Sequence, residues 1–163
     1  MIHPLTKKLK QQIKAYIYEL TVDIPRQLEY AMSLGDLSEN AEYEMAKERQ
    51  LFVESRITQL EKLLNRLKSV NLDDLPDNRV AYGSRVTVED LDSEQERTYL
   101  IVFDGEEPSH KASDDILVTV ESPIARALFG KQVGDEIQVN LPKGSFDWEI
   151  TGLVTFPELT RQG

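Results

Sequence analysis

Small or apolar side chains recur at alternating steps of three and four residues along positions 43–67. The series, which has Gln50 at one step, consists of Tyr43, Ala46, Val53, Ile57, Leu60, Leu64 and Leu67. A mean step of about 3.5 residues is typical of the seam between two paired helices, whereas a helix lying on a large core carries a broader apolar stripe. The pattern predicts one long helix from about Ser38 to Val70.

A second and less regular series lies upstream. It consists of Leu9, Ile13, Ile17, Leu20, Ile24 and Ala31, with Gln27 at the missing step and Leu28 beside it. Two seams separated by a few residues predict an antiparallel coiled-coil hairpin over residues 1–70. Pro25 lacks an N–H and disfavours helical geometry at the preceding residue, so we expect a kink or a helix restart near Asp23.

The turn of this hairpin is expected at residues 34–40, which we call the tip segment. Gly35 can adopt the left-handed conformation that ends a helix, and Asp36 or Ser38 can cap the helix that follows. The spacing of Asp36 and Glu39 also fits a capping box in which Asp replaces the usual Ser or Thr. Capping is therefore one interpretation of this carboxylate pair.

The second half of the chain is dominated by strand patterns. Residues 71–79 contain turn formers without a sustained period and predict a linker, and residues 80–163 form a second domain. Strands are expected near 85–89, 98–103, 116–120, 136–141 and 146–151, the last two joined by a turn at 142–144. A short helix at 123–129 would have Ser122 as its N-cap and Pro123 at its first position. The expected fold class is α+β, a helical hairpin plus an antiparallel sheet with one short helix.

Charge is distributed unevenly along the chain. The net charge is −10, but residues 1–70 carry 11 Lys/Arg against 10 Asp/Glu, whereas residues 71–163 carry 8 against 19. Such acidity disfavours direct, high-affinity binding to RNA or DNA. There is no cysteine, which excludes disulfides and thiolate zinc sites. No apolar run reaches the roughly 18 residues of a membrane span, so we expect a soluble, cytoplasmic protein without a membrane partner.

The concentrated chemistry lies around the tip segment. No basic residue occurs between Arg26 and Lys47, where five acids occur: Glu29, Asp36, Glu39, Glu42 and Glu44. Asp36 and Glu39 are three residues apart and could share one helical face. Such a pair could bind Mg²⁺, an ion usually held through one or two carboxylates together with substrate phosphates. The pair would therefore be half of a site, completed by a partner.

Two motifs carry a family resemblance. Residues 35–43, Gly-Asp-Leu-Ser-Glu-Asn-Ala-Glu-Tyr, resemble the tip signature of the bacterial Gre transcript-cleavage factors (GreA/GreB), and residues 122–131, Ser-Pro-Ile-Ala-Arg-Ala-Leu-Phe-Gly-Lys, resemble their second signature. The two motifs look more like GreA, whereas Trp148 is similar to GreB, so the subtype stays open with a lean to GreA. The resemblance covers nearly the whole chain and implies a coiled-coil hairpin followed by an FKBP-like domain.

The resemblance also implies a mechanism. Gre factors bind RNA polymerase at the rim of its secondary channel and insert the hairpin, whose tip acids help hold Mg²⁺ for hydrolysis of backtracked RNA near its 3′ end. Asp36 and Glu39 match those acids, while Asn40 and Tyr43 lie in the same motif and would shape the tip. Ser122 and Pro123 would lie near the polymerase-docking surface. The chain is then a monomeric cofactor of the polymerase rather than an enzyme, and contacts RNA only within that complex.

Three alternatives remain open at this point. A Gre-like inhibitor would occupy the secondary channel without supporting cleavage, although the intact Asp36 and Glu39 pair argues against it. A prolyl isomerase is suggested by analogy with the FKBP fold alone, which is a weak basis for assigning an activity. A coiled-coil holdase would require an apolar rather than an acidic tip.

Overall fold

The chain consists of two compact units. The structure is a computed structural model that describes residues 1–36 and 40–161. One unit comprises residues 2–70, and the other comprises residues 71–163 together with Met1. No helix in the described part of the chain is both long and apolar enough to cross a membrane.

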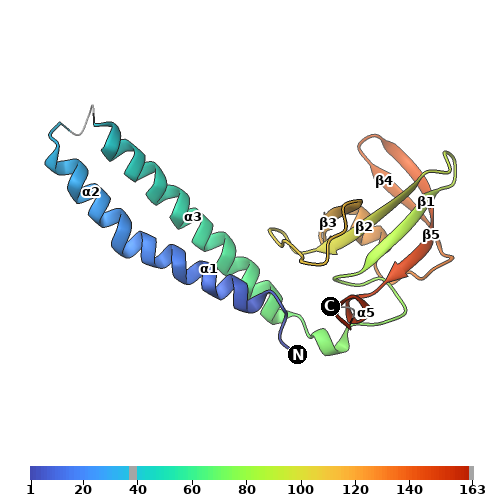
Figure 1. Ribbon diagram of the computed structural model, residues 1–163. Helices are drawn as coiled ribbons and strands as arrows, with labels where there is room; N and C mark the ends of the chain where they lie inside the picture. Colours follow the sequence, from blue (N-terminus) through green and yellow to red (C-terminus); the bar gives the residue numbers. More distant parts are fainter. Residues whose placement is uncertain (37–39, 162–163) are drawn as a thin grey trace. The chain divides into compact units, whose positions relative to one another are not determined.

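The first unit is a hairpin of two helical arms (Figure 1). The first arm contains α1 (Thr6–Tyr18), a π-helical turn η1 (Glu19–Asp23) and α2 (Ile24–Ser33). The second arm is the single helix α3 (Ala41–Ser69), which returns beside the first. The expected antiparallel hairpin is confirmed, although α3 begins at Ala41 rather than at Ser38.

The apolar seam of α3 faces the first arm. Its buried residues are Ala46, Val53, Leu60, Leu63, Leu64 and Leu67. Tyr43, Gln50 and Ile57 occupy the intervening steps and are half-buried. The alternation of three and four residues therefore lines the contact between the arms, as the sequence predicts.

The first arm departs from the regular pattern at η1. The N–H of Ile24 donates to the carbonyl of Glu19, five residues back, as in a π-helix. Pro25 supplies the physical reason, because its ring would crowd the carbonyl four residues before it and it has no N–H to donate. The helix restart expected near Asp23 thus takes the form of a widened turn.

This widened turn changes which side chains face α3. Ile17, predicted to lie in the seam, is 42% exposed, while its neighbour Tyr16 is half-buried. Beyond the turn, Ile24 is fully buried and Leu28 is half-buried, whereas Gln27 is exposed. The prediction for Ile17 was wrong because a regular 3–4 alternation does not allow for the extra residue that a π-turn accommodates.

An ion pair links the two arms at the same level. The Arg49 guanidinium donates to both carboxylate oxygens of Glu19, the first residue of η1, at 2.5 and 3.0 Å. It also lies 5.0 Å from the ring centroid of Phe52. The hydrogen bond from Arg49 lowers the pKa of Glu19. Because both side chains remain partly exposed, the pair aligns the arms more than it stabilises them.

The second unit is built on a five-stranded sheet. Its strands are β1 (Arg85–Asp90), β2 (Glu96–Val102), β3 (Asp115–Thr119), β4 (Glu136–Leu141) and β5 (Gly144–Val154), in the order β3-β2-β1-β5-β4. Leu141 pairs with Gly144, so a tight turn at Pro142 and Lys143 joins β4 to β5. Upstream of the sheet, the expected linker contains a short 3₁₀ turn, Leu72–Asp74.

One pairing differs from the expected antiparallel arrangement. β2 and β3 run parallel, whereas the β1–β2, β1–β5 and β4–β5 pairs are antiparallel. Residues 103–114 connect β2 to β3, and a connection of about a dozen residues is long enough for a crossover between parallel strands. The sheet is therefore mixed, because strand patterns predict strand positions but not their directions.

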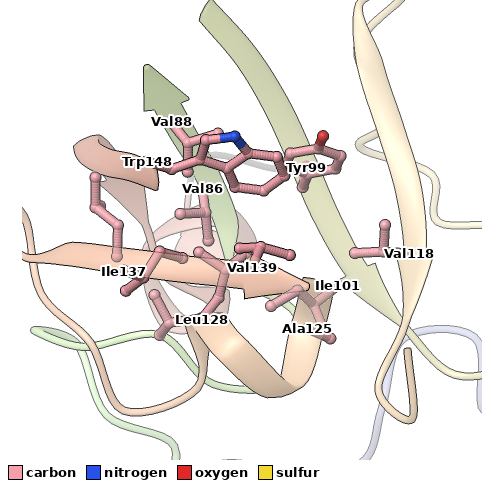
Figure 2. Close-up of a cluster of buried hydrophobic side chains, with 12 residues drawn as sticks. Val86, Val88, Tyr99, Ile101, Val118, Ala125, Leu128, Ile137, Val139 and Trp148 are labelled. Carbon is pink, nitrogen blue, oxygen red and sulfur yellow. The ribbon is translucent and has the colours of Figure 1, made fainter. Parts of the chain in front are cut away.

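Two short helices cover the sheet, where one was expected. Ala125 and Leu128 of α4 (Pro123–Leu128) join a buried cluster with Val139, and in Figure 2 they lie at the opposite end of this cluster from Trp148 and Tyr99. The rings of Trp148 and Tyr99 stack at a centroid distance of 5.6 Å. The second helix, α5 (Phe156–Arg161), places Leu159 against Leu100 and Val102, which alternate with the inward residues of β2.

Two isoleucines one helical turn apart provide a test of the corrected seam. Ile13→Ala should lower the free energy of unfolding by about 2–5 kcal/mol, since Ile13 is 8% exposed and its truncation leaves a cavity. Ile17→Ala, at a site that is 42% exposed, should cost about 1 kcal/mol or less. Urea denaturation followed by circular dichroism measures both values. Equal costs at the two positions would contradict the register described here.

Candidate functional site

The end of α2 leads directly into the tip segment. The last helical residue is Ser33, and the N–H of Leu34 donates to the carbonyl of Ala31 at 3.1 Å. Gly35 follows with φ +119°, a backbone conformation that residues other than glycine rarely adopt. Glycine therefore ends the first arm, as its place in the sequence suggests.

The start of α3 is fixed by Asn40. Its side-chain oxygen accepts a hydrogen bond from the N–H of Tyr43 at 3.2 Å, and its backbone carbonyl accepts from the N–H of Glu44 at 3.1 Å. The prediction that Asp36 or Ser38 caps this helix was wrong, because the helix begins two residues later than Ser38 would require. Asn is as good an N-cap as Asp or Ser, so the local chemistry allowed all three.

The candidate carboxylates lie between these two helix ends. Asp36 is exposed on the connection from α2 to α3. Glu39, together with Leu37 and Ser38, lies outside the described residues. The structure thus places one of the two predicted site acids, and it gives the N-cap position of α3 to Asn40.

The surroundings of Asp36 are rich in acids. Glu29, Glu42 and Glu44 are all exposed on the adjoining turns of α2 and α3. The first basic side chain beyond them, Lys47, lies with its Nζ 5.8 Å from the ring centroid of the half-buried Tyr43. Tyr43 therefore combines a seam position with a contact near the tip.

The donor groups around Asp36 determine how a metal ion could bind there. Among the described residues, no group of three or more His, Cys, Asp or Glu side chains is placed to hold a metal ion. Asp36 offers carboxylate oxygens, the donor type that Mg²⁺ prefers, from an exposed position. An ion held there would keep open positions for water, phosphate oxygens or the carboxylates of another molecule.

The second candidate, Ser122 with Pro123, starts α4. Ser122 Oγ accepts a hydrogen bond from the N–H of Ala125 at 3.1 Å, and Pro123 occupies the first turn, as predicted. Pro123 and Arg126 are exposed, whereas Ala125 is fully buried against the sheet. The start of this helix therefore has one face in the core and another available to a partner.

The sheet unit also has a groove that sequence reasoning missed. The groove has a volume of about 420 Å³. Its lining includes Trp148, Phe146 and Leu141, and Asp90, Arg97 and Lys143 are charged residues of the same lining. Backbone N–H groups of Ser93 and Asp92 lower the pKa of Asp90, so this carboxyl stays ionised. Strand alternation identified the inward-facing aromatics, and Trp148 is buried, but no sequence signal showed that Phe146 and Leu141 stay half-exposed at the β4–β5 hairpin.

Comparison with known proteins places both units in one family. The family model "Transcription elongation factor, N-terminal" matches residues 4–68, and "Transcription elongation factor, GreA/GreB, C-term" matches residues 75–153. Transcription elongation factor GreA of Nautilia profundicola is 39% identical over 151 residues, which cover 90% of this chain and 91% of that protein. GreA of Rhizobium etli is 43% identical over 143 residues, 88% of each chain.

Solved structures give a related match. The crystal structure of GreA factor homolog 1 of Thermus thermophilus is 26% identical, covers 91% of this chain and 93% of that one, and has a TM-score of 0.40. The sequence matches themselves span both units and most of each relative's length. The chain belongs to the GreA/GreB family of transcription elongation factors.

Proposed function

We propose that this protein binds bacterial RNA polymerase and stimulates hydrolytic cleavage of the backtracked RNA 3′ end. The hairpin would enter the secondary channel, and its acidic tip would help hold Mg²⁺ at the polymerase active centre. The observation that carries this proposal is the position of Asp36, exposed at the end of a two-helix rod among further acids. Membership of the GreA/GreB family supports the same reading.

The dimensions of the hairpin suit insertion into a narrow recess. α3 has 29 residues, which corresponds to about 43 Å at ~1.5 Å per residue. Two packed helices are far narrower than a globular domain, so the tip segment can reach a buried centre while the sheet unit remains outside. The family's mode of action requires such reach.

The chemistry assigned to the tip follows from its donors. Asp36 and Glu39 would supply oxygen ligands, and the polymerase and the RNA phosphate would supply the others. A second bound Mg²⁺ would stabilise the attacking and leaving oxygens of phosphodiester hydrolysis. The tip carboxylates would also orient the attacking water. The chain alone lacks the substrate and the remaining ligands, so it acts as a cofactor of the polymerase's own cleavage activity.

The start of α4 is the proposed docking contact. Pro123 and Arg126 are exposed beside Ser122, and this segment carries the second family motif. Binding through the sheet unit would leave the hairpin free to enter the channel. The groove beside Phe146 and Trp148 offers a second surface against which the Ser122 contact can be compared.

The tip acids are tested on a backtracked polymerase complex with end-labelled RNA and Mg²⁺. Asp36→Asn or Glu39→Gln should slow transcript shortening by at least about tenfold, because each replaces a charged metal ligand with a neutral amide of similar shape. Raising the Mg²⁺ concentration should restore part of the rate. Glu42→Gln, an exposed acid on the first turn of α3, is the matched control and should cleave at the parent rate.

Two other results would contradict the proposal. If the parent protein binds the complex tightly without shortening the RNA, the chain is a channel-occupying inhibitor. If Glu42→Gln is as defective as Asp36→Asn, general tip acidity rather than specific ligation controls cleavage.

The docking contact is tested by competition for polymerase. Ser122→Asp combined with Pro123→Ala should weaken binding by roughly tenfold or more, since it changes the exposed start of α4. Asp retains an N-cap oxygen, so the helix and the thermal unfolding midpoint should be kept. Phe146→Ala, in the groove, is the comparison variant. Loss of affinity in Phe146→Ala alone would move the docking surface from α4 to the groove.

A further inference from the structure

We propose that Asn40 is a positioning residue that joins the end of α2 to the start of α3 and so limits how far the two arms can separate on either side of Asp36. Its link between the arms is a property of the hairpin itself. Its effect on transcript cleavage rests on the proposed function. No role of this kind follows from helix capping alone, which concerns only α3.

Three polar groups of Asn40 are used at once. Oδ1 accepts from the N–H of Tyr43 at 3.2 Å, and the backbone carbonyl accepts from the N–H of Glu44 at 3.1 Å. Nδ2 donates to the carbonyl of Ala31 at 2.5 Å, nine residues earlier and on the other arm. These partners determine the orientation of the amide, because a backbone N–H requires an acceptor and a carbonyl requires a donor.

The partner on the first arm is well anchored. Ala31 is fully buried, and its carbonyl also accepts from the N–H of Leu34 as α2 ends. The hydrogen bond from Asn40 therefore joins the last turn of α2 to the first residue before α3. It holds together the two ends of the loop that connects α2 to α3, and Asp36 lies on this loop.

Closure of the loop bears directly on the site acids. A carboxylate on a loop with joined ends samples fewer positions than one on a loop whose ends can separate. Metal-assisted reactions are sensitive to displacements of about 1 Å in a positioned group. The same side chain thus starts α3 and limits how far the two arms can separate.

Substitutions at Asn40 can separate its two roles, which are to cap α3 and to bond to Ala31 on the other arm. Asp, Ser and Asn are comparable N-caps, because each offers an oxygen to the first turn. Asp has no N–H₂ group, so its second oxygen would face the carbonyl of Ala31 without a proton between them. Asn40→Asp should keep the cap and lose the link between the arms, whereas Asn40→Ala should lose both.

The link is tested by distance measurement in the full chain. Since the protein has no cysteine, Met32→Cys and Met45→Cys provide one spin label on each arm at positions that are 57% and 66% exposed. Pulsed electron paramagnetic resonance should give a narrow distance distribution with Asn40 and a broader or longer one with Asn40→Asp. Helicity and the unfolding midpoint of Asn40→Asp should stay close to the parent. An unchanged distribution overturns the proposal.

The effect of Asn40 on transcript cleavage is tested on the backtracked polymerase complex, with protein that carries no spin labels. Asn40→Asp should lower the maximal cleavage rate by roughly tenfold or more, while the factor concentration giving half of that rate stays unchanged. Glu54→Gln, at an exposed acid of α3 farther from the tip, is the control and should match the parent. A broadened distance distribution with an unchanged maximal rate would overturn the positioning role. If the parent itself does not shorten RNA, the proposed function fails, and the label distances still decide whether Asn40 joins the arms.

Discussion

The contact between the two arms is the constraint on which the rest of the hairpin depends. Neither arm buries its apolar stripe alone. Leu9 and Ile13 of α1 and the leucines in the C-terminal half of α3 are buried, and they stay so only while the arms remain antiparallel and in register. Towards the tip the buried residues become small, such as Ala31 and Ala46. Specific polar contacts therefore matter most where apolar burial is least.

Local chemistry adjusts this contact without breaking it. Pro25 forces a widened turn in the first arm, and the seam resumes on its far side with Ile24 fully buried. The Glu19–Arg49 pair lies at the same level and aligns the arms across the irregularity. The widened turn interrupts the regular repeat, and the ion pair that aligns the arms lies within a few residues of it.

Sequence patterns predicted the structure correctly where a feature depends only on a residue and its near neighbours in the chain. The seam of α3, the restart before Pro25 and the Ser122 cap of α4 were all predictable for that reason. Ile17 was misplaced because an extra residue in a helical turn leaves no mark in apolar spacing. The sequence does not single out Asn40 as the cap of α3, because Asp36 and Ser38 offer the same chemistry nearby. The parallel β2–β3 pair depends on the path of a connection, which periodicity does not encode. Glu39 stays a sequence prediction.

The strand order has a consequence for synthesis of the chain. β5, which follows the other four strands in chain order, lies between β1 and β4 and pairs with both. The sheet unit therefore cannot close until residue 154 has left the ribosome, whereas both arms of the hairpin are available once residue 70 has emerged. Translation itself orders these two folding events: the rod can form first, and the unit proposed to bind the polymerase forms after it.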